Sequence, residues 1–238
     1  ILAVQVGFLF VEFACARDID SEVILIKNVS DVAAGVLAYL MLGSLIFNGV
    51  TNWGAELEAP RTLLMALVAP MASRVLSGAT LGRLRLRPYA IISALLTVAI
   101  FPYAAFHVWQ PQGILRGRGF IDFGGGGVIH VTGGVAALLA TWWCKNAEQR
   151  FRRWADRGHS LQAGALGTCF MFMGWAGLAC ALHAQPSSAE RWAVVVHVVL
   201  TTTTSALVSC VSMLVYECLC MRDGRIEAWP IVSSVQAG

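Results

Sequence analysis

The chain has 238 residues, of which 57% are hydrophobic and only 13% are charged, and its mean hydropathy is +0.67. A water-soluble domain carries about twice that share of charged residues, because its surface must be hydrated. The composition therefore excludes an ordinary soluble protein and predicts a surface that faces lipid. The net charge of +3 comes without a long basic run, which argues against a nucleic-acid partner.

Apolar segments recur along the whole chain. A helix needs about 20 mainly apolar residues to cross a bilayer. We therefore expect an all-α polytopic membrane protein with about seven to eight spans. The first segment is short, and an eighth begins near Trp229, so we also expect the sequence to be a piece of a longer chain. The predicted spans cover residues 1–15, 31–49, 62–82, 89–109, 120–144, 162–183 and 192–216.

The distribution of Lys and Arg predicts how the spans are oriented. The odd-numbered loops hold most of the 17 Lys and Arg residues, whereas the even-numbered loops hold only Arg61, Arg116, Arg118 and Arg191. Positive residues accumulate on the side of the membrane that is not translocated. The odd-numbered loops are therefore expected inside and the N-terminus outside.

One span carries two ionisable residues among glycines. Asp122 and His130 are eight residues apart, so on one continuous helix they would share a face about 12 Å apart. Gly126 and Gly134 would lie on the same line and let another helix backbone approach. Ionisable residues inside a span usually face the bundle interior or a water-filled cavity. The alternative for Asp122 is a helix cap, and for His130 a hydrogen bond to a neighbouring carbonyl.

The sequence around these residues resembles a known signature. Asp-Phe-x-Gly-Gly-x-Val-x-His is similar to the fifth-helix motif of the ammonium transporter (Amt/Mep/Rh) family. Four other fragments resemble the family in the same order and at similar spacing over essentially the whole chain. They are Gln5-Val-Gly-Phe with Glu12, Lys27-Asn28-Val-Ser-Asp31, Phe101-Pro-Tyr with His107-Val-Trp109, and Gly174-Trp175-Ala-Gly177.

The resemblance implies an architecture. The family fold has about eleven helices in two inverted five-helix repeats, assembles as a trimer and has one pore in each subunit. In such folds the transport path lies at the repeat interface. We expect residues 1–145 to form the first repeat, residues 146–160 a polar inside loop, and residues 161–238 the start of the second repeat.

The resemblance also implies roles for individual residues. Trp109 matches a tryptophan of the outer vestibule, Asp122 a structural aspartate and His130 the first histidine of the pore lumen. Trp175 lies in the sixth-helix motif. The vestibule attracts ammonium through aromatic faces, and a cation–π contact contributes about 2 kcal/mol once the ion is desolvated.

Several positions depart from the family pattern. Leu64 and Val68 stand where the third helix of the family carries a gating phenylalanine. Arg74 replaces a small apolar residue, and its charge would repel ammonium unless it pairs with a carboxylate or carbonyls of a neighbouring helix. The positions of the second phenylalanine, the asparagine and the vestibule serine are occupied by Leu178, Ala179 and Leu182.

These departures define the functional hypotheses. The favoured one is a divergent, non-conducting family member that acts as a structural or accessory subunit of a larger membrane assembly. The alternative is a working ammonium or ammonia channel with an altered gate, and a sensor role has no specific support. We expect no enzyme activity, cofactor or metal, because nucleotide loops, zinc spacings and nucleophile–base pairs do not occur in the sequence.

The same hypotheses predict the binding partners and the membrane of the protein. The partners would be membrane lipids and either other membrane-protein subunits or two further copies of the chain. Ammonium would be a ligand only of a functional pore. The plasma membrane and an organellar inner membrane both fit the sequence.

Overall fold

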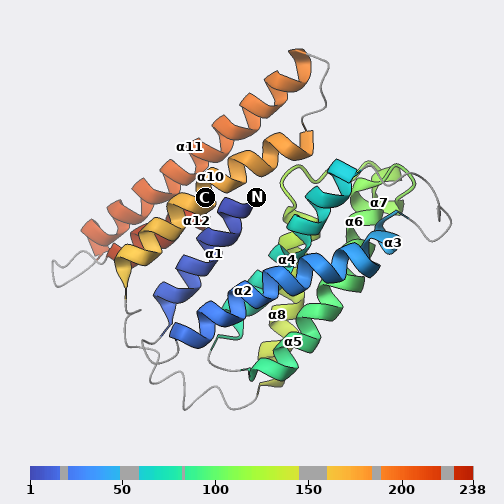
Figure 1. Ribbon diagram of the computed structural model, residues 1–238. Coiled ribbons are helices and arrows are strands. Elements are labelled where there is room, and N and C mark those ends of the chain that lie inside the picture. Colours follow the sequence, from blue (N-terminus) through green and yellow to red (C-terminus); the bar gives the residue numbers. More distant parts are fainter. Residues whose placement is uncertain are drawn as a thin grey trace. The chain divides into compact units, whose positions relative to one another are not determined.

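The computed structural model describes seven stretches of the chain, and helices dominate all of them (Figure 1). These stretches contain no β-strand. The helices group into two compact units, which are described separately: Ile1–Cys15 with Gly158–Gly238, and Ala16–Arg157. The described residues are 1–16, 21–48, 59–81, 84–144, 160–183, 189–220 and 228–237.

The Ala16–Arg157 unit is built around one central helix, α4 (Ala59–Ala79). Most of this helix is buried, whereas less than half of each other apolar helix of the unit is buried. The helix contains Pro70, and α2 crosses it there, because a Cβ on Gly35 would lie 2.9 Å from the Pro70 ring. A glycine at this crossing therefore lets α2 approach the proline.

Three further helical stretches pack against α4. The first is α2 (Ser21–Ala38), which continues through the π-helical turn Tyr39–Gly43 into α3 (Ser44–Phe47). The second is α5 (Leu86–Leu95), continued by Leu96–Ile100 and α6 (Phe101–Trp109). A short helix, α7 (Ile114–Gly117), follows, and the π-helical Gly126–Val131 leads into α8 (Thr132–Trp143).

The other unit contains α1 (Leu2–Cys15), α10 (Leu161–His183), α11 (Ala189–Cys220) and α12 (Ala228–Ala237). Glycines bring α1 and α10 together, since a Cβ on Gly167 would lie 2.8 Å from the Gly7 carbonyl oxygen. Phe10 stacks on Phe170 beside this contact, with ring centroids 6.2 Å apart. The Gln236 amide of α12 donates a hydrogen bond to the Thr168 hydroxyl at 2.7 Å.

Within the part of the chain that the structure describes, six helices are long and apolar enough to cross a membrane, and the all-α polytopic prediction is thereby confirmed. The helix Leu2–Cys15 is apolar but shorter. The compact units are groups of packed helices, whereas residues 1–145 and 161–238 were expected to be repeats. The division into repeats therefore stays a prediction.

Two predicted helix starts are wrong. The second helix begins at Ser21, not at residue 31, so Asn28 and Asp31 lie inside it, where other side chains bond to them. The fifth begins at Gly126, not at residue 120, because Gly125 adopts a left-handed conformation with φ +80°. A continuous helix cannot pass through that conformation.

On α8, the glycine that lets another helix approach is not the predicted one. A Cβ on Gly133 would lie 2.6 Å from the Ala72 carbonyl oxygen and 2.9 Å from Val75 Cβ on α4. A Cβ on Gly134 would meet no atom of the described residues within 4 Å. The contact between α8 and α4 therefore depends on Gly133.

We expect Gly133→Ala to lower the stability of the protein in detergent by about 1–3 kcal/mol, because the added methyl group overpacks the contact with α4. Thermal unfolding followed by intrinsic fluorescence measures the change. Gly134→Ala is the matched control, and its midpoint should stay at or slightly above the wild-type value, since alanine favours helix. Equal midpoints for both variants would contradict the assignment.

Candidate functional site

Asp122 caps the helix that contains His130. Its carboxylate Oδ2 accepts hydrogen bonds from the backbone N–H groups of Gly127 at 3.0 Å and Val128 at 2.9 Å. These N–H groups lie in the first turn, where no carbonyl of the same helix is available, and a negative charge there is favoured. The capping interpretation of Asp122 is confirmed. The shared helical face with His130 is wrong, because Asp122 precedes the helix.

Trp109 holds the segment that carries Asp122. Its indole N–H donates a hydrogen bond to the Asp122 backbone carbonyl at 3.1 Å. The indole ring also meets Phe101 edge-on, with ring centroids 6.3 Å apart, and Phe101 meets Tyr39 in the same way. A row of three aromatic rings from two helical stretches thus fixes the end of α6 against the loop.

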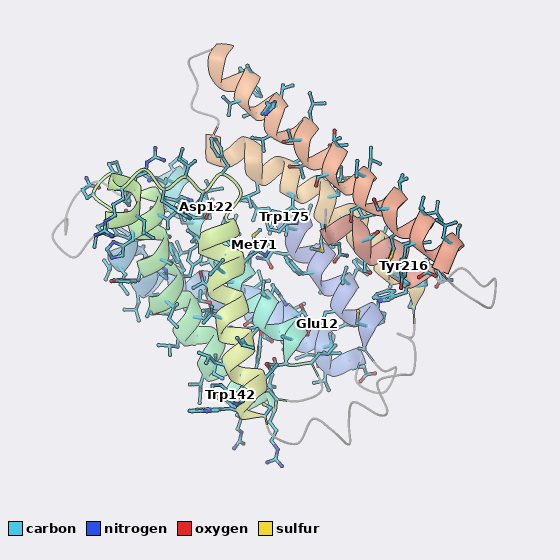
Figure 2. The ribbon with its side chains drawn as sticks, turned by 180° about the vertical axis from the view of Figure 1, so that it is seen from behind. Glu12, Met71, Asp122, Trp142, Trp175 and Tyr216 are labelled. Atoms are coloured by element: carbon cyan, nitrogen blue, oxygen red, sulfur yellow. The ribbon has the colours of Figure 1, made fainter. Side chains whose placement is uncertain are left out.

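His130 lies within the first turns of the helix after the cap, and its side chain is exposed within its unit. Figure 2 shows Asp122 at one end of this helix and Trp142 at the other. The structure therefore brings Trp109, Asp122 and His130 to the same end of the Ala16–Arg157 unit. Trp175, on α10, belongs to the other unit.

The positions that depart from the family pattern are mostly packed into helix contacts. Val68 and Leu178 are fully buried, and Leu64 is half-buried. The side chains of Ala179 and Leu182 lie outside the described residues. At the three described positions, the structure therefore presents aliphatic surface only.

Arg74 is 2% exposed and lies in the C-terminal half of α4. Its guanidinium donates hydrogen bonds to the side-chain oxygen and the backbone carbonyl of Asn28 on α2. The Asn28 amide in turn donates to the Ile24 carbonyl at 2.9 Å. The pairing interpretation of Arg74 is thereby confirmed, with an asparagine and a carbonyl as acceptors.

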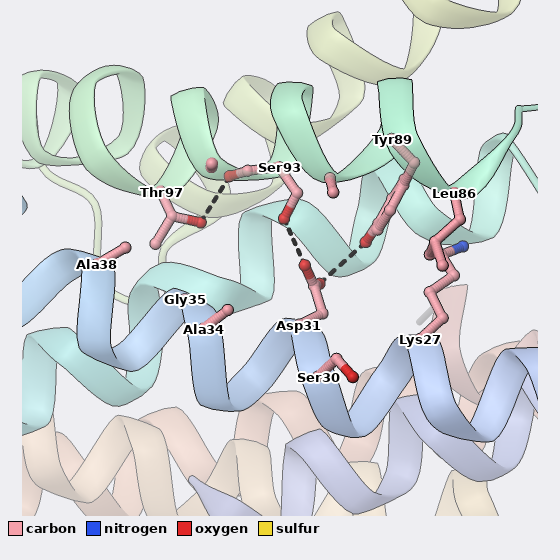
Figure 3. A pocket seen from close by; sticks show the side chains of 12 residues that line it. Lys27, Ser30, Asp31, Ala34, Gly35, Ala38, Leu86, Tyr89, Ser93 and Thr97 are labelled. Atoms are coloured by element: carbon pink, nitrogen blue, oxygen red, sulfur yellow. Dashed lines mark hydrogen bonds between the residues drawn. The ribbon is translucent and has the colours of Figure 1, made fainter.

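A buried carboxylate lies one helical turn further along α2. Asp31 accepts hydrogen bonds from the hydroxyl groups of Tyr89, at 2.9 Å, and Ser93 (Figure 3). It accepts a third from the hydroxyl group of Ser73 at 3.0 Å. These donors come from α4 and α5, so the carboxylate joins three helices. Neither Asp31 nor its donors were predicted as site residues. The sequence did contain a pattern that could have predicted a polar contact here. Tyr89, Ser93 and Thr97 recur every four residues along an apolar span, so they form a polar line on one face of the helix.

The fold and these polar groups define an integral, multi-pass membrane protein with charged groups satisfied inside the bundle. Comparison with known proteins identifies the family. The model of the Ammonium Transporter Family matches residues 1–238, and the chain belongs to that family.

Individual relatives agree with this assignment. The chain is 31% identical over 210 residues to ammonium transporter Amt2 of Haloferax mediterranei. The aligned region covers 78% of this chain and 46% of the relative. It is 31% identical over 186 residues to ammonium transporter 1 member 1 of Oryza sativa, covering 65% of this chain and 36% of the relative. The chain thus spans less than half the length of these relatives.

A solved structure has the same fold. The structure titled Sensor Amt Protein superposes with a TM-score of 0.82, covering 99% of this chain and 63% of that chain, at 23% sequence identity. At this identity the likeness establishes the fold alone. The predicted membership of a divergent chain in the family is confirmed.

We expect Arg74→Leu to destabilise the protein by about 2–4 kcal/mol, because it leaves the buried Asn28 oxygens without their donor and the nearby Asp31 with one cation fewer. Unfolding in a detergent titration measures the loss. The control is Arg61→Leu, which removes an exposed guanidinium that bonds to Gln110 at 3.3 Å and should cost less than about 1 kcal/mol. A loss no greater for Arg74→Leu than for the control would contradict the role of the buried pair.

Replacement of Asp122 by alanine should destabilise the protein by about 1–2 kcal/mol, since two N–H groups of the first helical turn lose their acceptor. Asp122→Asn keeps a side-chain oxygen and should recover part of the loss. Hydrogen exchange at the amides of Gly127 and Val128 reports the effect locally. Unchanged exchange in Asp122→Ala would show that the carboxylate does not cap the helix.

Proposed function

We propose that the protein is a non-conducting member of the ammonium transporter family that acts as a structural or accessory subunit of a larger membrane assembly. The observation that carries the proposal is the aliphatic side chains of Leu64, Val68 and Leu178, which stand where the family resemblance implies phenylalanines, and two of which are fully buried. A cation that enters a narrow apolar path must exchange its hydration shell for polar or aromatic groups. Aliphatic side chains offer neither.

Arg74 supports the same proposal from the interior of the bundle. Arginine keeps its charge in any protein environment. Its guanidinium is bound to Asn28, so it stabilises the contact between α2 and α4 and is not free to exchange with an ion. The buried charges of this unit therefore serve packing.

The long apolar helix α11 supports a subunit role. Only one face of this helix, with Val195 and Ala206, is buried within its unit, and large apolar side chains elsewhere on it are exposed, among them Trp192, Leu200, Leu207 and Leu219. Lipid or further protein must cover this surface. Other membrane-protein subunits would cover it under the proposal, and copies of the chain in a trimer under the alternative.

The alternative is a working channel for ammonium or ammonia with an altered gate. It is favoured by the arrangement of Trp109, Asp122 and His130, since the tryptophan is bonded to the capped segment from which the histidine-bearing helix begins. An exposed imidazole at this position is available to line a pore.

Flux measurements separate the two functions. The full-length protein, expressed from its complete reading frame, is reconstituted in liposomes, and an ammonium gradient is applied while an internal dye reports pH. We expect a response equal to that of protein-free vesicles, because the site does not offset dehydration of the ion. Amt2 of Haloferax mediterranei, reconstituted in the same way, is the positive control.

A response above protein-free vesicles that falls in His130→Ala would contradict the proposal and establish the channel. Native mass spectrometry of the protein in mild detergent tests the subunit role. The proposal requires a mass that includes other polypeptides. A particle composed only of copies of this chain would overturn it.

A further inference from the structure

A slot of about 190 Å³ opens between α2 and α5 in the Ala16–Arg157 unit (Figure 3). Its two walls consist largely of small side chains, because Ala34, Gly35 and Ala38 of α2 face Ala90 and Ala94 of α5. The surface that the walls expose to the slot is mainly apolar, so it suits a slender apolar occupant.

The two ends of the slot differ in polarity. Figure 3 shows Lys27 and Leu86 at one end, and Ala38 and Thr97 at the other. The Lys27 ammonium group lies 4.1 Å from the centroid of the Tyr89 ring. Arg85 and Arg87, both exposed, flank Leu86 at the start of α5. One end therefore carries a concentration of positive charge.

Asp31 lines the wall of the slot, but its charge is already engaged. Its two carboxylate oxygens accept hydrogen bonds from Ser73, Tyr89 and Ser93. The carboxylate is 9% exposed. An anion at the basic end would therefore meet cations, while the carboxylate stays solvated by hydroxyl groups.

The surface around the slot is apolar. On α2, Ile26 and Val29 are more than 60% exposed, and on α5, Ile91 is 71% and Leu95 56% exposed. Both helices belong to predicted membrane spans. A lipid of the bilayer would therefore have direct access to the slot.

We propose that the slot binds one acyl chain of an anionic phospholipid, with the lipid phosphate at Lys27, Arg85 and Arg87. The slot supplies an apolar channel for the chain, and the three cations supply the charge complement. The Lys and Arg distribution places this end on the inner side, where anionic lipids attract basic residues near the surface. The proposal does not depend on whether the protein conducts ammonium.

Lipid titration of the full-length protein tests the proposal. Native mass spectrometry measures binding of phosphatidylglycerol and of phosphatidylcholine with the same acyl chains. We expect tighter binding of phosphatidylglycerol, and a loss of about fivefold for each cation removed in Arg85→Gln/Arg87→Gln. Arg116→Gln/Arg118→Gln, which removes two exposed guanidiniums from an even-numbered loop, should keep the wild-type affinity.

A second variant tests the acyl chain. Ala94→Leu fills the slot from an exposed position, so it should leave thermal stability unchanged and weaken binding of both lipids at least tenfold. An equal loss of phosphatidylglycerol affinity in Arg85→Gln/Arg87→Gln and in Arg116→Gln/Arg118→Gln would mean that general surface charge attracts the lipid, and it would overturn the proposal. Unchanged lipid binding in Ala94→Leu, with a change in the number of copies in the particle, would assign the slot to a second copy of the chain and also overturn it.

Discussion

The burial of two charges within a lipid-facing bundle governs the structure of the Ala16–Arg157 unit. A buried charge costs several kcal/mol unless partners replace its water. Here Asp31 accepts hydrogen bonds from hydroxyl groups on two other helices, and Arg74 donates hydrogen bonds to Asn28, which lies on the same helix as Asp31. Since α2, α4 and α5 each supply a partner, the polar groups fix which helices are neighbours and in what register. Apolar packing alone would leave that register weakly specified, because lipid is as apolar as the helices.

The end of the unit that carries Asp122 is organised differently. Single side chains there form hydrogen bonds with backbone groups. The Asp122 carboxylate accepts hydrogen bonds from two backbone N–H groups, and the Trp109 indole donates one to the backbone carbonyl of Asp122. Gly125 allows the chain to turn into the helix at this point. The result places the His130 imidazole at a defined height on its helix. An ammonium transporter could use that position, and a scaffold that has lost conduction would keep it because the capping remains necessary for folding.

Much of the fold could be predicted from the sequence, because length and hydropathy decide which segments cross a membrane. The motifs around Asp122 and Trp109 led to the correct family. The start of α2 was misplaced because Glu22 and Lys27 lower the hydropathy of its first turns, although helical structure begins at Ser21. The hydroxyl shell of Asp31 could not be predicted, since Ser73, Tyr89 and Ser93 come together only through packing. Gly133 and Gly134 are likewise equivalent in sequence, and only the direction of α4 distinguishes them.

The length of α11 has a consequence for the membrane itself. Its apolar stretch Trp192–Leu219 has 28 residues, which extend about 42 Å at 1.5 Å per residue. The hydrocarbon core of a typical bilayer is about 30 Å thick. An upright α11 would therefore carry about 12 Å of apolar surface into the headgroup region, and tilting or local thickening of the bilayer relieves that hydrophobic mismatch. A thicker membrane accommodates this helix with less distortion, so membrane thickness becomes a determinant of where the protein resides.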